Sequence, residues 1–183
     1  LDQLRVLFDT NVLGMLAVTQ AVFPGMADRR GGRIINMGSA VGLVPVPFLA
    51  SYCASKSAVH IVSQGLRLEA KPFGIDVVVV QAGGVQSNIA EAGLRDIERF
   101  KSPDSRYRPY YDGIRKCTEA SQDDATPADE FARDLVARAF ATPAPRTVRL
   151  GTGVNFLLKV ANMPEEQRDA VFSGSYGLDS SAP

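Results

Sequence analysis

The chain has 183 residues, 45% of them hydrophobic, which is enough for one globular domain with a core and too few for two large domains. Lys and Arg total 20 and Asp and Glu total 20, and this zero net charge gives no electrostatic reason to expect a nucleic-acid partner. The two cysteines, Cys53 and Cys117, lie far apart without any Cys/His pairing. This pattern predicts no metal site and favours reduced thiols in a cytoplasmic protein.

The first half of the chain predicts a helix, a strand, a second helix and a second strand. Apolar residues recur close to the helical period over residues 3–26, and Pro24 and Gly25 mark the end of that helix. The run GRIINM predicts a strand, residues 51–72 a second long helix, and IDVVVVQA a strand covered on both faces. This order is typical of an α/β fold with a parallel sheet. No apolar run reaches the roughly 20 residues of a membrane-spanning helix, so we expect no transmembrane segment.

The second half is less regular. Residues 89–125 are charged and aromatic and predict one or two short helices. Thr126 is expected to cap a helix that has Pro127 at its first position and continues to Thr142. The run TVRLG predicts a last strand, followed by an apolar tail with a break at Pro164. We therefore treat the chain as a single domain with a core at 1–88, an irregular region at 89–125, and a helix, strand and helical tail at 126–178.

Three side chains near the first predicted strand can carry chemistry. Tyr52 and Lys56 are four residues apart, so in a helix they lie on one face, one turn apart. Ser39 stands thirteen residues before Tyr52, where the strand would end. A strand end facing the first turn of the next helix is where open α/β sheets build active sites. For acid–base work near pH 7, the tyrosine anion must be stabilised by about 4 kcal/mol, and we expect Lys56 to lower the pKa of Tyr52.

Four motifs together resemble the short-chain dehydrogenase/reductase family. They are N-V-x-G at residues 11–14, G-R-I-I-N-M-G-S ending at Ser39, Y-C-A-S-K at 52–56, and A-G-G-V-Q-S at 82–87. The match covers residues 1–88 and, more loosely, the helix from Asp129 and the strand at 147–150. It implies a Rossmann-like parallel sheet with flanking helices, of which the chain has the C-terminal two thirds. The N-terminal strands and the glycine-rich motif are missing, because no G-x-x-x-G-x-G occurs in the chain.

The resemblance also implies roles for the catalytic candidates. Tyr52 would exchange a proton with the substrate, and Lys56 would in addition bond the nicotinamide ribose. Ser39 would polarise the substrate carbonyl. Asn11 would orient a water molecule that links Lys56 to solvent.

The glycine turn after the second strand would face the cofactor. The resemblance implies NADP or NAD, with NADP preferred, and no metal. It places the nicotinamide end against the turn with Gly83 and Gly84, where backbone groups around Val85 would meet the carboxamide and Ser87 would contact a phosphate or the amide. Ala82 stands where the family usually has proline, which relaxes the backbone before the glycines.

As a whole, the resemblance implies an NAD(P)-dependent oxidoreductase that interconverts a carbonyl and a secondary alcohol, here as a truncated chain. The amino-acid sequence is most similar to the branch of the family that contains hydroxysteroid, retinol and acyl-dihydroxyacetone-phosphate reductases. This similarity favours a lipid-like substrate. Residues 89–125 would form the substrate lid, and the helices at 3–26 and 51–72 would pair in a homodimer.

Other interpretations of the same residues stay open. The chain could be a non-catalytic binding or interaction protein derived from such an enzyme. Tyr52 and Lys56 could be an exposed helix pair, Ser39 a turn cap, and Asn11 a side chain that satisfies a backbone group at a kink. A hydrolase using Ser39 and His60 is disfavoured, because N-M-G-S-A stands in place of a G-x-S-x-G elbow, so we expect His60 to be a packed or interfacial residue.

Overall fold

The computed structural model describes residues 1–179, and in this part of the chain three parallel strands form one sheet in the order β1-β2-β3. The strands are β1 (Gly32–Met37), β2 (Ile75–Ala82) and β3 (Thr147–Leu150). Pairing of β1 with β2 runs from Gly32↔Ile75 to Met37↔Val80, and pairing of β2 with β3 from Val79↔Thr147 to Ala82↔Leu150. The predicted parallel α/β fold is confirmed, and the carboxyl ends of all three strands meet at one edge.

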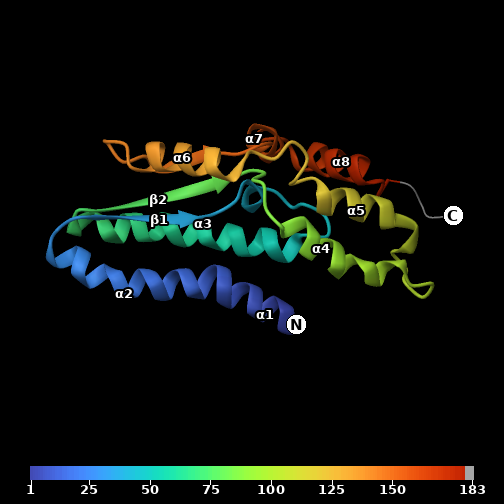
Figure 1. The fold of residues 1–183 in the computed structure, drawn as a ribbon, viewed down its shortest axis with the longest axis horizontal. Coiled ribbons are helices and arrows are strands. Elements are labelled where there is room, and N and C mark those ends of the chain that lie inside the picture. The colour runs from blue at the N-terminus through green and yellow to red at the C-terminus, as the bar shows by residue number, and fades with distance from the viewer. Residues whose placement is uncertain (180–183) are drawn as a thin grey trace.

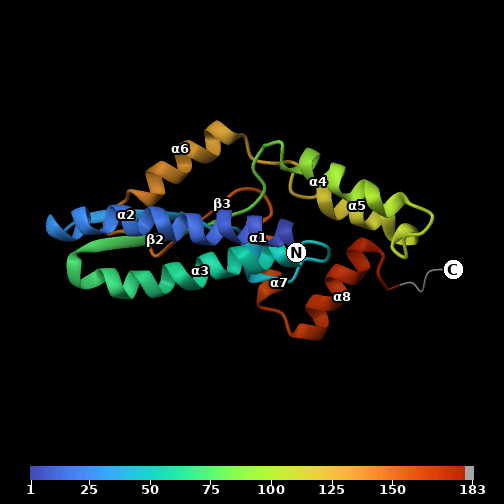
Figure 2. The same ribbon diagram turned by 90° about the horizontal axis from the view of Figure 1, so that it is seen from below.

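Helices cover both faces of the sheet (Figures 1 and 2). On one face, α2 (Gly14–Asp28) and α3 (Ala50–Ala70) enclose Ile34 and Val77, while on the other α6 (Ala128–Ala139) packs on Val78 and Val80. Successive β2 side chains point to opposite faces, and both faces are covered. This explains why the β2 sequence is an unbroken aliphatic run.

The N-terminal helical segment is continuous but not regular. It consists of α1 (Asp2–Phe8), a π-helical turn at Asp9–Leu13, and α2. The predicted helix is confirmed, but its predicted end is wrong: Pro24 lies inside α2, which continues to Asp28. The helix runs two residues past the predicted end, and Met26 and Ala27, which follow Pro24, pack on the buried cluster around Ile34; such tertiary packing can outweigh the cost of an internal proline.

The same segment bears on the membrane prediction. By length and composition, Asp2–Asp28 is apolar enough to cross a membrane, with a mean hydropathy of 1.5 over a window that is 11% buried. Core helices of soluble proteins and N-terminal signal sequences share these properties, so one such helix is weak evidence for a span. The absence of a transmembrane segment stays a prediction.

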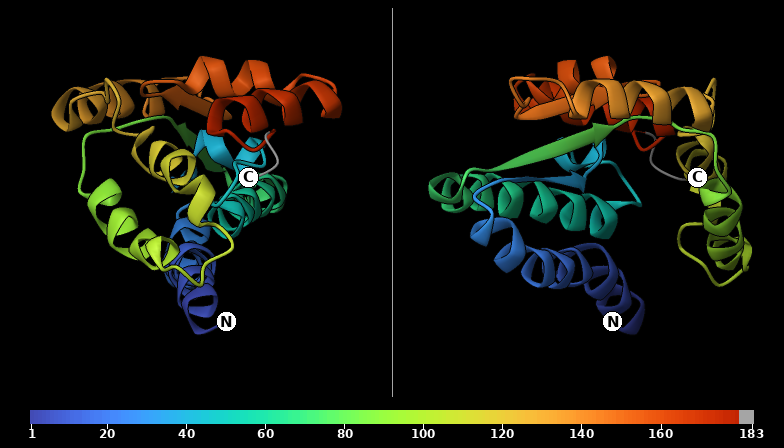
Figure 3. Two further views of the ribbon diagram at one scale, coloured as in Figure 1. Left: turned by 90° about the vertical axis from the view of Figure 1, so that its right-hand side faces the viewer. Right: turned by 60° about the vertical axis from the view of Figure 1, so that its left-hand side comes forward.

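The irregular region contains two helices, as predicted. They are α4 (Ile89–Ile97) and α5 (Tyr111–Glu119), and the pair extends beyond the carboxyl end of the sheet (Figure 3). The tail forms α7 (Val154–Ala161) and α8 (Glu165–Tyr176), with the predicted break at Pro164, the residue that precedes α8.

The start of α6 differs from the prediction. Pro127, not Thr126, is the residue that caps the helix, and α6 ends at Ala139 rather than at Thr142. The hydroxyl of Thr126 is hydrogen-bonded to the hydroxyl of Thr152, at 3.1 Å, instead of to a helix N–H. This contact ties the start of α6 to the end of β3.

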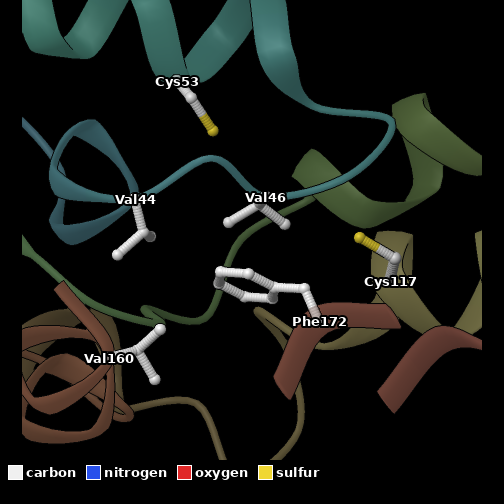
Figure 4. Close-up of a cluster of buried hydrophobic side chains, with 6 residues drawn as sticks. All are labelled: Val44, Val46, Cys53, Cys117, Val160 and Phe172. Atoms are coloured by element: carbon white, nitrogen blue, oxygen red, sulfur yellow. The ribbon is translucent and has the colours of Figure 1, made fainter. Parts of the chain in front are cut away.

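A buried cluster fixes the loop that leads into α3 (Figure 4). Val44 and Val46 of this loop pack with Cys53 of α3 and with residues of the C-terminal helices, including Val160 and Phe172. The cluster also contains Cys117 of α5. The loop between Ser39 and Tyr52 is therefore held from both sides.

Candidate active site

Ser39 lies just past the end of β1 and joins the carboxyl ends of two strands. Its hydroxyl donates to the Ala82 carbonyl oxygen of β2 at 3.2 Å and accepts from the Val41 amide at 3.4 Å. The second contact caps the short 3-10 turn at Ala40–Leu43, so the capping interpretation of Ser39 is correct. Capping does not compete with a catalytic role, because it holds the hydroxyl at the strand ends.

Tyr52 lies in the first turn of α3 and is half-buried next to Ser39. Burial raises the pKa of Tyr52, and the neighbouring Cys53 thiol adds to this, while a hydrogen bond with the Ser39 side chain acts in the opposite direction. The net result is a pKa above the ordinary value for tyrosine. Tyr52 is thus protonated at neutral pH and can donate its proton.

Lys56 lies one turn further along α3. Its Nζ donates to the Met37 carbonyl oxygen at 3.0 Å and is 5.7 Å from the centre of the Tyr52 ring. Burial lowers the pKa of Lys56. Lys56 is not among the groups that shift the pKa of Tyr52 in this arrangement, where burial dominates, so the role of Lys56 in stabilising the tyrosine anion stays a prediction.

Asn11 reaches the same region from the π-helical turn. Its side-chain amide donates to the Ser55 hydroxyl at 3.0 Å, and Ser55 donates to the Tyr52 carbonyl oxygen at 2.8 Å. Asn11 thus connects the N-terminal helix to the first turns of α3, through a side-chain hydroxyl and not through a backbone group as the structural interpretation expected. Short π-helical segments are common at functional sites, and the role of Asn11 in orienting a water molecule stays a prediction.

The glycine turn after β2 is packed tightly against neighbouring backbone. The Gly83 amide donates to the Leu150 carbonyl at 2.8 Å and the Gly84 amide to the Thr152 carbonyl at 2.7 Å. A Cβ on Gly83 would collide with the Thr152 carbonyl oxygen. These glycines therefore shape the turn, and their amides are engaged within the chain.

The next part of this turn is bound by Gln122. No sequence motif had singled out this residue. Its side-chain nitrogen donates to the Val85 carbonyl at 3.1 Å, and its side-chain oxygen accepts from the Ser87 amide at 3.0 Å. A carboxamide thus fits between these backbone groups, which offer one acceptor and one donor. Nicotinamide carries the same carboxamide group, and the role of Val85 and Ser87 in binding it stays a prediction.

His60 is buried, as expected, and does not activate Ser39. The Ser39 hydroxyl contacts Ala82 and Tyr52, whereas His60 accepts a hydrogen bond from the Ser39 backbone amide. A Ser–His hydrolase is therefore not supported. Among residues 1–179, no group of three His, Cys, Asp or Glu side chains could hold a metal ion.

Comparisons with known proteins agree with this geometry. The short chain dehydrogenase family model matches residues 1–97. The chain is 30% identical over 160 residues to YusZ, an uncharacterized oxidoreductase of Bacillus subtilis, covering 86% of this chain and 57% of that protein. It is 33% identical over 151 residues to the NADPH-dependent 1-acyldihydroxyacetone phosphate reductase of Saccharomyces cerevisiae, covering 82% and 49%.

A solved structure gives the same fold. The crystal structure of a short-chain dehydrogenase from Streptomyces avermitilis aligns with a TM-score of 0.69 and 22% identity, over 97% of this chain and 61% of that one. The chain spans about half the length of the curated relatives it matches, at 57% and 49% of the two above. Because the family model matches residues 1–97 of 183, more than half of the sequence, the chain belongs to the short-chain dehydrogenase family.

Proposed function

We propose that the protein is an NAD(P)-dependent oxidoreductase that interconverts a carbonyl and a secondary alcohol. The observation that carries this proposal is the convergence of Ser39, Tyr52 and Lys56 at the carboxyl ends of β1 and β2. A bound dinucleotide supplies or accepts the hydride. The chain's own residues bind the substrate oxygen and move the proton.

In the direction of reduction, Tyr52 donates its proton to the substrate oxygen. Its raised pKa keeps it protonated before the reaction, and the neighbouring Ser39 hydroxyl, held at the strand ends by the Ala82 carbonyl, is placed to bond the same oxygen. Donation leaves a tyrosinate, whose charge Lys56 stabilises from one turn away on α3. In this role, Lys56 exchanges its bond to Met37 for the phenolate and the cofactor ribose.

We propose NADP as the preferred cofactor, with its nicotinamide carboxamide on Val85 and Ser87. Support comes from the Gln122 carboxamide bound to these two groups and from the yeast relative, which is described as NADPH-dependent. Binding at this site requires Gln122 to give up both hydrogen bonds. Breaking these bonds costs about 1 kcal/mol per bond, and the hydrogen bonds of the incoming carboxamide offset this cost.

The phosphate end of the dinucleotide requires residues that this chain does not contain. No G-x-x-x-G-x-G motif is present, and β1 is an outer strand among residues 1–179. A groove of about 480 Å³ lies between α2 and β1, lined by residues that include Met15, Val18, Met37 and Lys56. We propose that a further parallel strand of the natural protein pairs with β1, covers this groove and completes the cofactor site.

A lipid-like substrate is supported by an aromatic cluster next to the catalytic loop. Phe48, between Ser39 and Tyr52, packs edge-on to Tyr107 with ring centres 6.0 Å apart, and Tyr107 packs on Phe100 at 5.7 Å. Phe48 and Tyr107 are both exposed, so this apolar surface can meet a substrate chain. The yeast relative is described as a reductase of an acylated substrate.

The assay for this proposal uses the full-length natural protein with NADPH or NADH and a series of ketones of increasing alkyl chain length. We expect carbonyl-dependent oxidation of NADPH, with kcat/KM rising along the series. Tyr107→Ala should reduce this rise, and Tyr111→Phe in the same lid region serves as the matched control. Failure to oxidise NADPH or NADH with any ketone, together with failure to oxidise any alcohol in the reverse direction, would contradict the proposal and favour a binding module.

We also propose a homodimer through the helices at 3–26 and 51–72. Large apolar side chains are exposed on both, among them Leu13 at 56% and Leu68 at 74%. Exposed apolar surface of this kind is typical of protein interfaces. Sedimentation analysis should show a dimer that Leu68→Glu weakens, whereas a monomer at micromolar concentration would contradict the proposal.

A further inference from the structure

The imidazole of His60 contacts the backbone of the catalytic serine. His60 lies two turns after Tyr52 on α3 and is 3% exposed. The Ser39 amide donates to its Nε2 at 3.4 Å. The histidine thus touches the loop that carries Ser39 through the main chain, and not through the serine hydroxyl.

Two glycines of the loop lie too close to this ring to carry a side chain. A Cβ on Gly38 would collide with Nε2 and Cδ2 of His60, and it would lie 2.7 Å from the Val80 carbonyl oxygen. A Cβ on Gly42 would lie 2.8 Å from Cε1 of the same ring. Side chains at these positions would displace the loop or the imidazole. The backbone on both sides of Ser39 therefore packs closely against His60, and at Gly42 equally closely against the Lys56 backbone, 2.8 Å from that Cβ position.

The contact requires one protonation state of the ring. Nε2 accepts a hydrogen bond only in neutral imidazole, and the proton then resides on Nδ1. Nδ1 is buried and has no hydrogen-bond partner among residues 1–179. In the protonated ring, Nε2–H would face the Ser39 N–H, so two donors would oppose each other and the contact would be lost.

We propose that His60 is a positioning residue whose neutral imidazole holds the Ser39 amide and so keeps the Ser39 hydroxyl beside Tyr52. The proposal rests on the proposed function only in taking Ser39 to be a residue that contacts the substrate. It assigns no catalytic step to His60. The histidine acts through the backbone of the residue that it holds.

The surroundings of His60 keep it neutral. Burial lowers the pKa of His60, and the positive charge of Lys56 on the same helix lowers it further. No titratable side chain occurs at residues 38–49 of the packed loop. The only titratable residues of β1 and β2 are Arg33 and Asp76. Their side chains pair at 3.0 Å near the amino ends of the strands, whereas Ser39 follows the carboxyl end of β1. Tyr52 and Cys53 are further titratable groups on α3; burial raises the pKa of each, so both are uncharged at neutral pH.

A direct test follows the His60 ring and the Ser39 amide by NMR. In the full-length protein labelled with ¹⁵N-histidine and ¹⁵N-serine, His60→Gln identifies the His60 imidazole and Ser39→Ala identifies the Ser39 amide. At pH 7 we expect an unprotonated Nε2 and a protonated Nδ1. As the pH falls below 6.5, the Ser39 amide resonance should move with the same midpoint as the His60 ring.

Variants separate this role from general packing. His60→Gln retains an acceptor near the position of Nε2 and should leave the Ser39 amide close to its wild-type shift without the low-pH transition. His60→Leu fills the space without an acceptor and should displace that resonance. Ser63→Ala, a buried change on the same helix that removes a bond to Asn36, is the matched control and should lower stability without moving the Ser39 amide.

Two results would overturn the proposal. The first is a proton on Nε2 at pH 7, measured in the wild-type protein and independent of any variant's folding. The second is a Ser39 amide that does not follow the His60 titration. Neither measurement involves turnover, so a failure of the oxidoreductase proposal would leave this test intact.

Discussion

Asn11 donates its side-chain amide to the Ser55 hydroxyl at 3.0 Å, and this contact spans 44 residues of sequence. It joins the π-helical turn of the N-terminal helix to α3 directly behind Tyr52, because Ser55 bonds the Tyr52 carbonyl. The first turn of α3 is therefore anchored from outside the sheet.

A double-mutant cycle measures this anchor. Asn11→Ala and Ser55→Ala should each lower the free energy of unfolding by about 1 kcal/mol, and the double variant should lose less than the sum, since the two changes remove one shared bond. Urea unfolding gives all three values. A cycle that pairs Ser55→Ala with Asn36→Ala is the control and should be additive, because Asn36 bonds Ser63 instead.

The fold was predictable where the signal is local. Helical periodicity and β-branched runs identified the two long helices and all three strands, because each pattern is set by residues within one element. Pro24 and Pro127 were misinterpreted because packing decided both ends. Met26 and Ala27, partly buried after Pro24, pack on the cluster around Ile34, and Thr126 bonds Thr152 across the molecule.

The candidate site was also predictable only where the signal is local. Ser39, Tyr52 and Lys56 come together because a strand end and the following helix turn are adjacent in any such fold. Gln122 binds Val85 and Ser87 from an irregular segment 35 to 37 residues away, and no local pattern encodes that contact. The raised pKa of Tyr52 results from burial, which the spacing of Tyr52 and Lys56 does not reveal.

Removing the Gln122 side chain should strengthen cofactor binding. Gln122→Ala eliminates the group that competes with a nicotinamide carboxamide, so we expect the Kd for NADPH of the full-length protein to fall by up to about tenfold. Fluorescence titration measures this. Gln122→Glu is the matched control, because its carboxylate cannot donate to Val85. An unchanged or higher Kd for the alanine variant would show that Gln122 does not compete for these groups.

Alkaline pH should destabilise the C-terminal helices. Burial raises the pKa of Cys117 to about 11 and that of Tyr176 to about 12, above the unfolded values of 9 and 10. Both groups are neutral when folded, so their contribution is complete below pH 9 and is lost as pH rises through about 11 and 12. Urea midpoints at pH 8, 10 and 11 should fall steadily.

The double variant Cys117→Ala with Tyr176→Phe should show a smaller fall in urea midpoint over the same range. An identical pH dependence in this variant and the wild type would mean that these two groups do not cause the effect. The same burial predicts that native Cys117 reacts slowly with a thiol reagent at pH 8 and rapidly in urea.

The central claim is that Tyr52 supplies the proton at the end of the sheet, and Tyr52→Phe tests it most directly, since it removes the hydroxyl and keeps the ring. In the full-length protein with NADPH and its best carbonyl substrate, we predict that kcat falls by about 100-fold or more while the Kd for NADPH changes little. Tyr111→Phe, which removes a hydroxyl bonded to Glu98 in the lid region, should leave kcat close to wild type. A Tyr52→Phe variant with nearly wild-type kcat would contradict the account.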